Sequence, residues 1–199
     1  ANCGDSTNMG VSDCPITLSF ITNAIAIPKG FVIPATEMVD NNTFNAYINE
    51  QLESVSNRFY ITQPLLEITD NTGDPVTESR NNTDYIVTSK PYNWKWLVSQ
   101  SICDYKNMKR LLQYSQGKFD FLFLDSLGNV WGNAGIDEDG ANGMGGYTMA
   151  QVYIPDWTPS TSKALVKFMI SMIFANNLQL TDTSVFISSN FVATTTGLI

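Results

Sequence analysis

With 199 residues, a mass of 22.0 kDa and 43% hydrophobic residues, the chain suits one medium-sized domain with a hydrophobic core. Its net charge of −8 disfavours sequence-specific nucleic-acid binding, since a positively charged groove for phosphates has little material to be built from. The chain contains no histidine, the commonest acid–base group and metal ligand near neutral pH, so most hydrolase, transferase and metalloenzyme mechanisms are disfavoured.

The surface is expected to be polar rather than charged. Only 15% of the residues carry a charge, against roughly 25% in an average soluble domain, and asparagine, threonine and serine supply the polarity instead. Interface cores are depleted in charge, so this composition favours a protein that buries much of its exterior against copies of itself. A simple compositional bias of its lineage toward asparagine and threonine explains the same numbers, and the sequence leaves both readings open.

The chain divides into an N-terminal arm, one domain and a short tail. Residues 1–14 are polar and form the expected arm, 15–193 form a single β-rich domain, and 194–199 form a polar tail. No signal peptide is recognisable and no apolar run is long enough to span a bilayer, so we expect a soluble protein. Three cysteines make neither a disulfide framework nor a zinc pattern, and a bridge between the first two stays open: Cys3, Cys14 and Cys103.

The first half of the domain predicts short strands and one helix. Alternation of Ile16, Leu18 and Phe20 with other residues indicates a half-buried strand that ends near Pro28. A short edge strand over 31–33 follows, because proline at 34 cannot donate into a sheet. An apolar stripe predicts a helix between Asn42 and Asn57, capped by Asn42 or Thr43 and including Phe44, Tyr47, Ile48, Leu52 and Val55. Further strands are expected over 58–62, 65–69 and 85–88, with a turn over 70–75.

A second helix is expected after residue 100. Ser101 and Asp104 have capping-box spacing and precede an apolar stripe, and Gly117 is well placed to end the helix. In the strand that follows, Phe119, Phe121 and Phe123 occupy one face, while Asp120, Leu122 and Leu124 occupy the other. The turn residues 125–129 then predict a hairpin with Val130 and Trp131.

The glycine-rich segment 132–146 is expected to be a long flexible loop. It lacks the lysine and the Ser/Thr of a phosphate-binding loop. Asp137 and Asp139 resemble the start of a calcium loop, but the glycine and the twelfth residue are misplaced for an EF-hand. An irregular calcium site there stays open against an ordinary solvated loop.

The last third predicts strands over 147–154, 163–174, 185–187 and 191–193, with a turn over 155–159. The strand over 163–174 is apolar on both faces toward its far end, so it needs cover on both sides. The chain shows no regular alternation of strands and helices and no internal repeat. We therefore predict a mainly β or α+β domain, an antiparallel β-sandwich or barrel with two flanking helices.

One group of aromatic residues is the candidate interaction site. Tyr92, Trp94 and Trp96 project to the same face of an extended segment, and Trp157 in a later turn is added to this candidate interface patch. Such a ladder suits stacking on sugars or filling a subunit interface, and packing in the core is the plainer alternative.

No catalytic, cofactor-binding or metal-binding residues are predicted. Asp120, Asp125 and Asp156 lie beside strands, where aspartates more often serve turns and caps than catalysis. Cys103 has no histidine to activate it, and a small buried side chain is the simpler reading.

The second half resembles virion structural proteins of tailed bacteriophages, particularly those infecting Bacteroidota. The resemblance covers about residues 100–187 and rests on a helix followed by KFDFLFLDSLGNVWG, YTMAQVYIPDWTPS and KALVKFMISMIF. It implies a tail-tube-like β-sandwich with a flanking helix, a long loop reaching a neighbouring subunit and terminal arms. The acidic balance agrees, because a channel that conducts DNA should repel phosphate.

The expected function is thus that of a non-enzymatic virion protein, made in the bacterial host cytoplasm, that binds copies of itself and other virion proteins. A tail-tube subunit is favoured, and a capsid decoration, head-fibre or connector-ring protein is the nearest alternative. A carbohydrate-binding or adhesin domain that uses Tyr92, Trp94 and Trp96 belongs to another class. An enzyme working with carboxylates alone comes third.

Overall fold

The computed structural model describes most of the predicted domain. The predicted arm of 1–14, the tail of 194–199, the three cysteines and Trp157 lie outside the described residues, as do the predicted strand over 191–193 and the start of the strand over 163–174. The described residues are 19–62, 64–80, 83–99, 105–106, 108–113, 117–136, 139–140, 142–156, 167–180 and 183–187.

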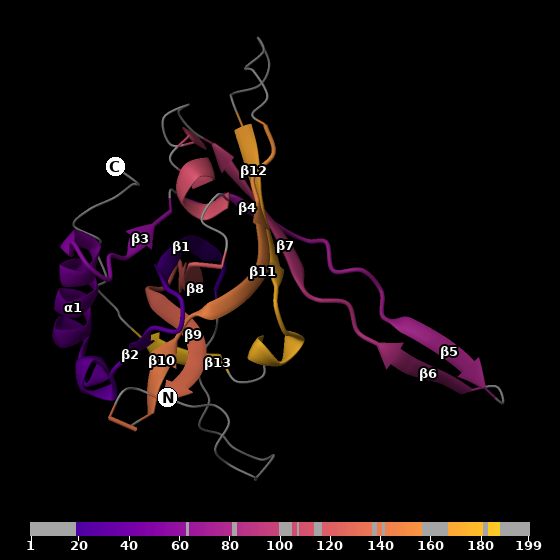
Figure 1. Cartoon of the computed structure of the whole chain (residues 1–199), viewed down its shortest axis with the longest axis horizontal. Coiled ribbons are helices and arrows are strands. Elements are labelled where there is room, and N and C mark those ends of the chain that lie inside the picture. Colours follow the sequence, from indigo (N-terminus) through magenta and orange to yellow (C-terminus); the bar gives the residue numbers. More distant parts are fainter. Residues whose placement is uncertain are drawn as a thin grey trace.

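Strands dominate the described chain (Figure 1). The strands are β1 (Ile21–Pro28), β2 (Val32–Ile33), β3 (Tyr60–Ile61), β4 (Glu67–Asp70), β5 (Val76–Arg80), β6 (Thr83–Thr88), β7 (Asn93–Ser99), β8 (Phe119–Asp125), β9 (Asn129–Ile136), β10 (Asn142–Gly145), β11 (Tyr147–Tyr153), β12 (Lys167–Phe174) and β13 (Thr183–Ile187). The helical segments are the α-helix α1 (Asn41–Glu53), the 3-10 turns η1 (Ala35–Met38) and η3 (Asn177–Leu180), and the π-helical turn η2 (Lys109–Gln113).

The predicted mainly β class is confirmed. Eleven strands form one antiparallel sheet along the path β2-β10-β9-β8-β11-β12-β7-β4, with β1 and β3 joined through β8 and β13 joined through β9. β5 and β6 form a separate two-stranded sheet. The large sheet does not close on itself within the described residues, so the barrel alternative is wrong.

Strand β8 is the centre of the body, because both of its faces are buried. Phe121 and Phe123 belong to one hydrophobic cluster, and Leu122 and Leu124 belong to a second one on the opposite face, as the alternation predicts. β1 pairs along one edge of β8. On the other edge the sheet divides: β11 pairs with β8 at Phe121, and β9 pairs with it at Phe123.

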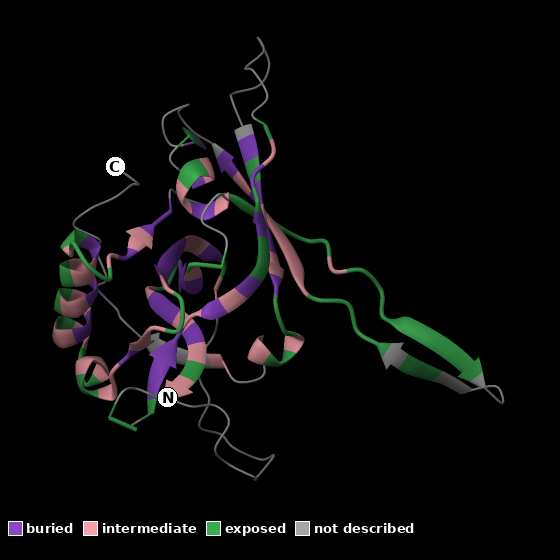
Figure 2. Ribbon diagram, viewed as in Figure 1, coloured by how far each residue is buried: buried purple, intermediate pink, exposed green. Residues whose placement is uncertain are grey.

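The first cluster lies between β8 and the sheet formed by β7, β12 and β11 (Figure 2). Each strand contributes alternate side chains, since successive residues of a strand face opposite sides. Trp96 and Val98 come from β7, and four alternate residues of β12, Phe168, Ile170, Met172 and Phe174, complete the inner layer.

The second cluster lies between β8 and helix α1. Phe44, Ile48 and Leu52 are spaced four residues apart, which places them on one side of the helix, and all three are buried. The predicted helix is therefore confirmed, with two corrections. Its N-cap is Asp40, whose carboxylate accepts from the backbone N–H groups of Asn42 and Thr43.

The helix also ends earlier than predicted. Its last residue is Glu53, and Val55 lies fully exposed beyond it. The chain turns back there, because Arg58 Nε donates to the carbonyl of Leu52 at 3.1 Å and the backbone N–H of Phe59 donates to that of Gln51 at 3.0 Å. These donors satisfy carbonyl groups that a longer helix would have bonded internally.

The second helix is described only in part. Residues 101–104, which carry the predicted capping box, lie outside the described residues. Tyr105, Met108 and Leu112 are buried against the first cluster, as their spacing predicts. Gly117 has φ of 76°, a left-handed conformation that suits glycine after a helix.

The segment 132–146 is not the predicted flexible loop. Its described residues continue β9 and form β10, and the two strands pair antiparallel from Asn133 opposite Gly145 to Ile136 opposite Asn142. A Cβ placed on Gly132 would lie 2.5 Å from the carbonyl oxygen of Gly145, and one on Gly143 would lie 2.5 Å from that of Ile33. Here glycine permits close packing of strands rather than mobility.

Two other predicted strands are shifted. Phe20, expected to face the core, is 66% exposed, and β1 begins after it. The first cluster takes Ala24 and Ala26 from β1, and the second takes Ile25 and Ile27. The strand is thus covered on both sides rather than half-buried. The predicted strand over 58–62 shortens to β3, and β5 lies in the segment 76–80, for which no strand was predicted.

Candidate functional site

The hairpin of β5 and β6 projects from the body (Figures 1 and 2). Its strands pair antiparallel, with Glu78 opposite Tyr85 and Thr77 opposite Ile86. Tyr85 and Ile86 therefore point to opposite faces of the hairpin, and they are 55% and 68% exposed. Val76 at the start of β5 is also exposed. Every side chain of the hairpin whose burial the structure describes is exposed.

Polar contacts hold the base of this hairpin to the body. Asn177, on η3, accepts from the backbone N–H of Tyr92 at 3.1 Å and donates to the carbonyl of Lys90 at 2.8 Å and to the hydroxyl of Ser89 at 3.1 Å. These contacts fix the segment that leads from β6 into β7. One side chain, 85 or more residues away in sequence, therefore sets where the hairpin leaves the body.

The other connecting segment is held in the same way. The hydroxyl of Thr72 accepts from the backbone N–H of Asn93 at 3.0 Å, and Asp70 accepts from the backbone N–H of Thr72 at 2.8 Å. Hydrogen bonds with Thr72 lower the pKa of Asp70: the one with the Thr72 side chain contributes most, and the one with its backbone N–H comes second. The segment before β5 is thus tied to the start of β7 and the segment after β6 to η3, and the hairpin projects from the body beyond these ties.

The outer face of the β11–β12–β7 sheet carries an open groove of about 300 Å³. Its residues come in rows across the strands: Gln151 lies opposite Ile173, Tyr153 opposite Ser171, and Ser171 opposite Lys95. The floor is mostly apolar, and Met169 is 39% exposed. The complete lining is Asn93, Lys95, Gln151, Tyr153, Pro155, Met169, Ser171 and Ile173.

The predicted aromatic patch lies largely on the inner side of the same sheet. Tyr92, Trp94 and Trp96 are brought together as predicted, with Trp94 and Trp96 edge-to-face at 5.9 Å between ring centroids. Trp96 is completely buried and lies 5.6 Å from Phe123, and Trp94 packs edge-to-face on Phe174 at 4.7 Å. The core alternative therefore holds for Trp96, which is inaccessible to a sugar or a partner.

Three aspartates singled out in the sequence serve separate structural roles. Asp125 accepts hydrogen bonds from the backbone N–H groups of Ser19, Leu127 and Asn129, from the amide of Asn129 and from the indole of Trp131. Burial raises its pKa, but these donors outweigh it, and the pKa of Asp125 lies below its usual value. Asp125 thus organises the turn between β8 and β9.

Asp120 and Asp156 have other partners. The buried carboxylate of Asp120 accepts from the backbone N–H of Gly30 at 2.8 Å, and its other oxygen has no hydrogen-bond partner among the described residues. Asp156 is exposed and forms an ion pair with Lys109 at 2.6 Å. Tyr105 donates to the same carboxylate oxygen at 3.1 Å and accepts from Lys109 at 2.8 Å.

This Lys109–Tyr105–Asp156 group joins η2 to the end of β11. The hydrogen bonds of Asp156 and Tyr105 raise the pKa of Lys109, and that of Lys109 lowers the pKa of Asp156. Both shifts stabilise the charged forms of Lys109 and Asp156. Its geometry is that of a tie between segments.

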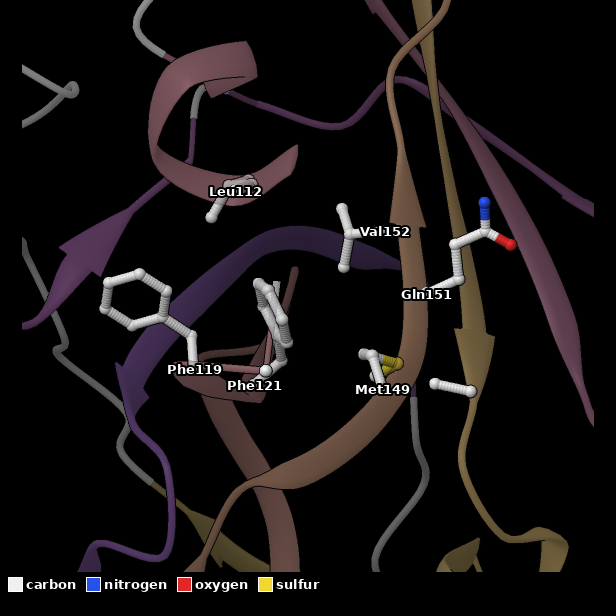
Figure 3. A pocket seen from close by; sticks show the side chains of 8 residues that line it. Leu112, Phe119, Phe121, Met149, Gln151 and Val152 are labelled. Carbon is white, nitrogen blue, oxygen red and sulfur yellow. The ribbon is translucent and has the colours of Figure 1, made fainter. Parts of the chain in front are cut away.

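A second, smaller cavity lies inside the body. Figure 3 shows Leu112, Phe121 and Val152 pointing into it between η2, β8 and β11. Its volume is about 10 Å³, which suffices for about one water molecule. It is therefore a packing gap and not a ligand site.

The described residues contain no group of three or more Cys, Asp or Glu side chains placed to hold a metal ion. Asp137 lies outside them, so the open question of a calcium site stays untested. Within the same residues, none of the helices has the length and apolarity to cross a membrane.

The chain matches no protein-family model and no curated protein. The hairpin and the groove are the features that the core and the turns leave unexplained.

The prediction of the aromatic patch missed both surfaces. A signal for the hairpin existed: Val76, Thr77 and Thr83 favour strands, and Asn81-Asn82 tolerates the left-handed backbone of tight turns. For the groove the sequence holds no comparable signal, because its lining comes from three strands that are distant along the chain.

Proposed function

We propose that the protein is a non-enzymatic structural component of a tailed-phage virion that assembles with copies of itself and with other virion proteins. A tail-tube subunit is the favoured form. The observation that carries the proposal is the projecting β5–β6 hairpin, whose described apolar side chains, Val76, Tyr85 and Ile86, are exposed.

An isolated hairpin gains stability when another molecule covers it. A two-stranded hairpin is at best marginally stable in water, because it buries too little apolar surface to offset the entropy of ordering it. A hairpin held away from the body gains that burial when another molecule covers it. Self-assembly would cover the exposed hairpin in this way, whereas catalysis does not require such a contact.

Charge and composition point the same way. The chain combines a low charged fraction with a net charge of −8. Low charge suits surfaces that are covered in an assembly, and an acidic wall repels DNA that must pass without sticking. Asp125 is engaged in a turn, and Asp156 and Lys109 bond to each other, which supports a role without catalysis.

The test is the mass of the purified protein under native conditions, followed by electron microscopy of any assembly. We expect a homo-oligomer, and a ring of six subunits that stacks would support the tail tube. Dimers or trimers would contradict the tube and favour a capsid decoration protein. A stable monomer at all concentrations would overturn the proposal.

A further inference from the structure

We propose that the β5–β6 hairpin of one copy docks in the outer groove of a second copy, over Lys95, Tyr153 and Met169. This inference rests on the proposed self-assembly and adds to it the two surfaces that meet. It commits to a second copy of this chain as the occupant of the groove.

The apolar character of the two surfaces matches. The hairpin exposes Tyr85 on one face and Ile86 on the other, and the face with Ile86, which is 68% exposed, is the one that meets the groove. The groove offers a mostly apolar floor with Met169 and Ile173. Covering these side chains removes apolar area from water on both copies, which is the main driving force of association.

The dimensions also agree. The five residues of β5 span about 17 Å at about 3.3 Å per residue. The groove crosses the three strands β11, β12 and β7, which at about 4.8 Å per spacing is roughly 10 Å. The two strands of the hairpin, about 4.8 Å apart, can therefore cover the groove, and the length of the hairpin extends beyond it.

Charge favours this pairing over an unrelated occupant. Residues 74–86 contain three acidic residues, Asp74, Glu78 and Asp84, and one basic residue, Arg80. The lining of the groove contains one cation, Lys95, and no carboxylate. Asp156, next to the lining residue Pro155, is already paired with Lys109. In an acidic chain, an acidic hairpin and a groove with a single cation are complementary.

The hairpin does not lie over the groove of its own chain (Figure 1). Both connecting segments are tied to the start of β7 and to η3 by the bonds of Thr72 and Asn177. The hairpin leaves the body beyond these ties and points away from it (Figure 1). In this position the hairpin leaves the groove of its own chain uncovered, and a second copy can supply the occupant.

The test uses one variant on each surface and measures mass by light scattering. Ile86→Asp places a charge on the hairpin, and Met169→Asp places one in the groove. Both positions are exposed, so each variant is expected to fold, as a thermal melt would verify. We expect each variant alone to be monomeric. An equimolar mixture should form a dimer of one copy of each, because one intact hairpin then meets one intact groove.

Two further variants complete the design. Leu127→Asp alters a similarly exposed apolar residue in the turn between β8 and β9, and it should assemble as the unmodified protein does. Lys95→Glu should weaken assembly at least tenfold. It reverses the charge of the one cation in the lining and leaves the apolar side chains of Met169 and Ile173 unchanged. It therefore tests the groove independently of Met169→Asp.

The outcomes separate the two proposals. Assembly of the unmodified protein that Ile86→Asp and Met169→Asp leave intact would overturn the hairpin–groove contact but not the proposed self-assembly. A mixture of the two variants that stays monomeric would overturn the contact as well. An unmodified protein that is monomeric at every concentration would overturn both.

Discussion

Strand β8 and the β5–β6 hairpin are both antiparallel β-structure, yet they differ in what surrounds them. β8 has hydrophobic clusters on both faces, so each of its side chains from Phe121 to Leu124 is buried. In the hairpin, the described side chains are all exposed. The buried side chains of β8 therefore stabilise the fold. The exposed side chains of the hairpin contribute little to it, because a chain gains little from ordering side chains that remain in water, and they are available for contact with another molecule.

The sharpest test of this contrast is at the centre of the body. Phe123→Ala should lower the free energy of unfolding by about 3–5 kcal/mol, because the ring packs against Trp96, Tyr147 and Phe174 and its loss leaves a cavity. Denaturant unfolding followed by tryptophan fluorescence measures the change. A loss below about 1 kcal/mol would show that this cluster does not stabilise the fold.

The second test concerns the glycines of the β9–β10 hairpin. Gly132→Ala should cost about 1–3 kcal/mol, because the new methyl group would lie 2.5 Å from a carbonyl oxygen and 2.7 Å from Leu122. Gly145→Ala is the matched control, since its nearest neighbour would lie at 3.7 Å. Thermal melts of the two variants compare them. Equal stability would revive the reading of 132–146 as a flexible loop.

The third test uses pH at the turn between β8 and β9. Folding lowers the pKa of Asp125 below its usual value of 3.8, so the ionised form stabilises the fold above that pH, and this contribution is lost as the pH falls through and below it. Asp125→Asn should lower stability at pH 7 by about 1–2 kcal/mol. It should also flatten the decline in melting temperature below pH 4. An unchanged acid decline would assign it to other carboxylates.

The smallest effect on stability is expected in the hairpin. Tyr85→Ser should change the free energy of unfolding by no more than about 0.5 kcal/mol, because the side chain is exposed in its own chain. The measurement is urea unfolding at a concentration where the protein is monomeric. A large loss would mean that the hairpin packs on its own body, which would remove the contrast with β8.

Much of the body was predictable from local pattern. The alternation in β8, the turn at Asp125 and the stripe of Phe44, Ile48 and Leu52 all predicted the observed elements, because burial of one face imposes a period of two on a strand and of 3.6 on a helix. The second half of the chain also predicted β11 and β12. The mainly β class followed from these patterns alone.

Tertiary structure decided the rest. The glycines at 132 and 143 predicted a flexible loop, but in the fold they allow neighbouring strands to approach closely. Trp96 was predicted as part of an interaction patch, but β8 and β12 cover it. The same holds for the groove, whose rows join residues such as Lys95, Ser171 and Tyr153. Sequence determines which residues share a face of a strand, whereas only the order of strands in the sheet determines what that face meets.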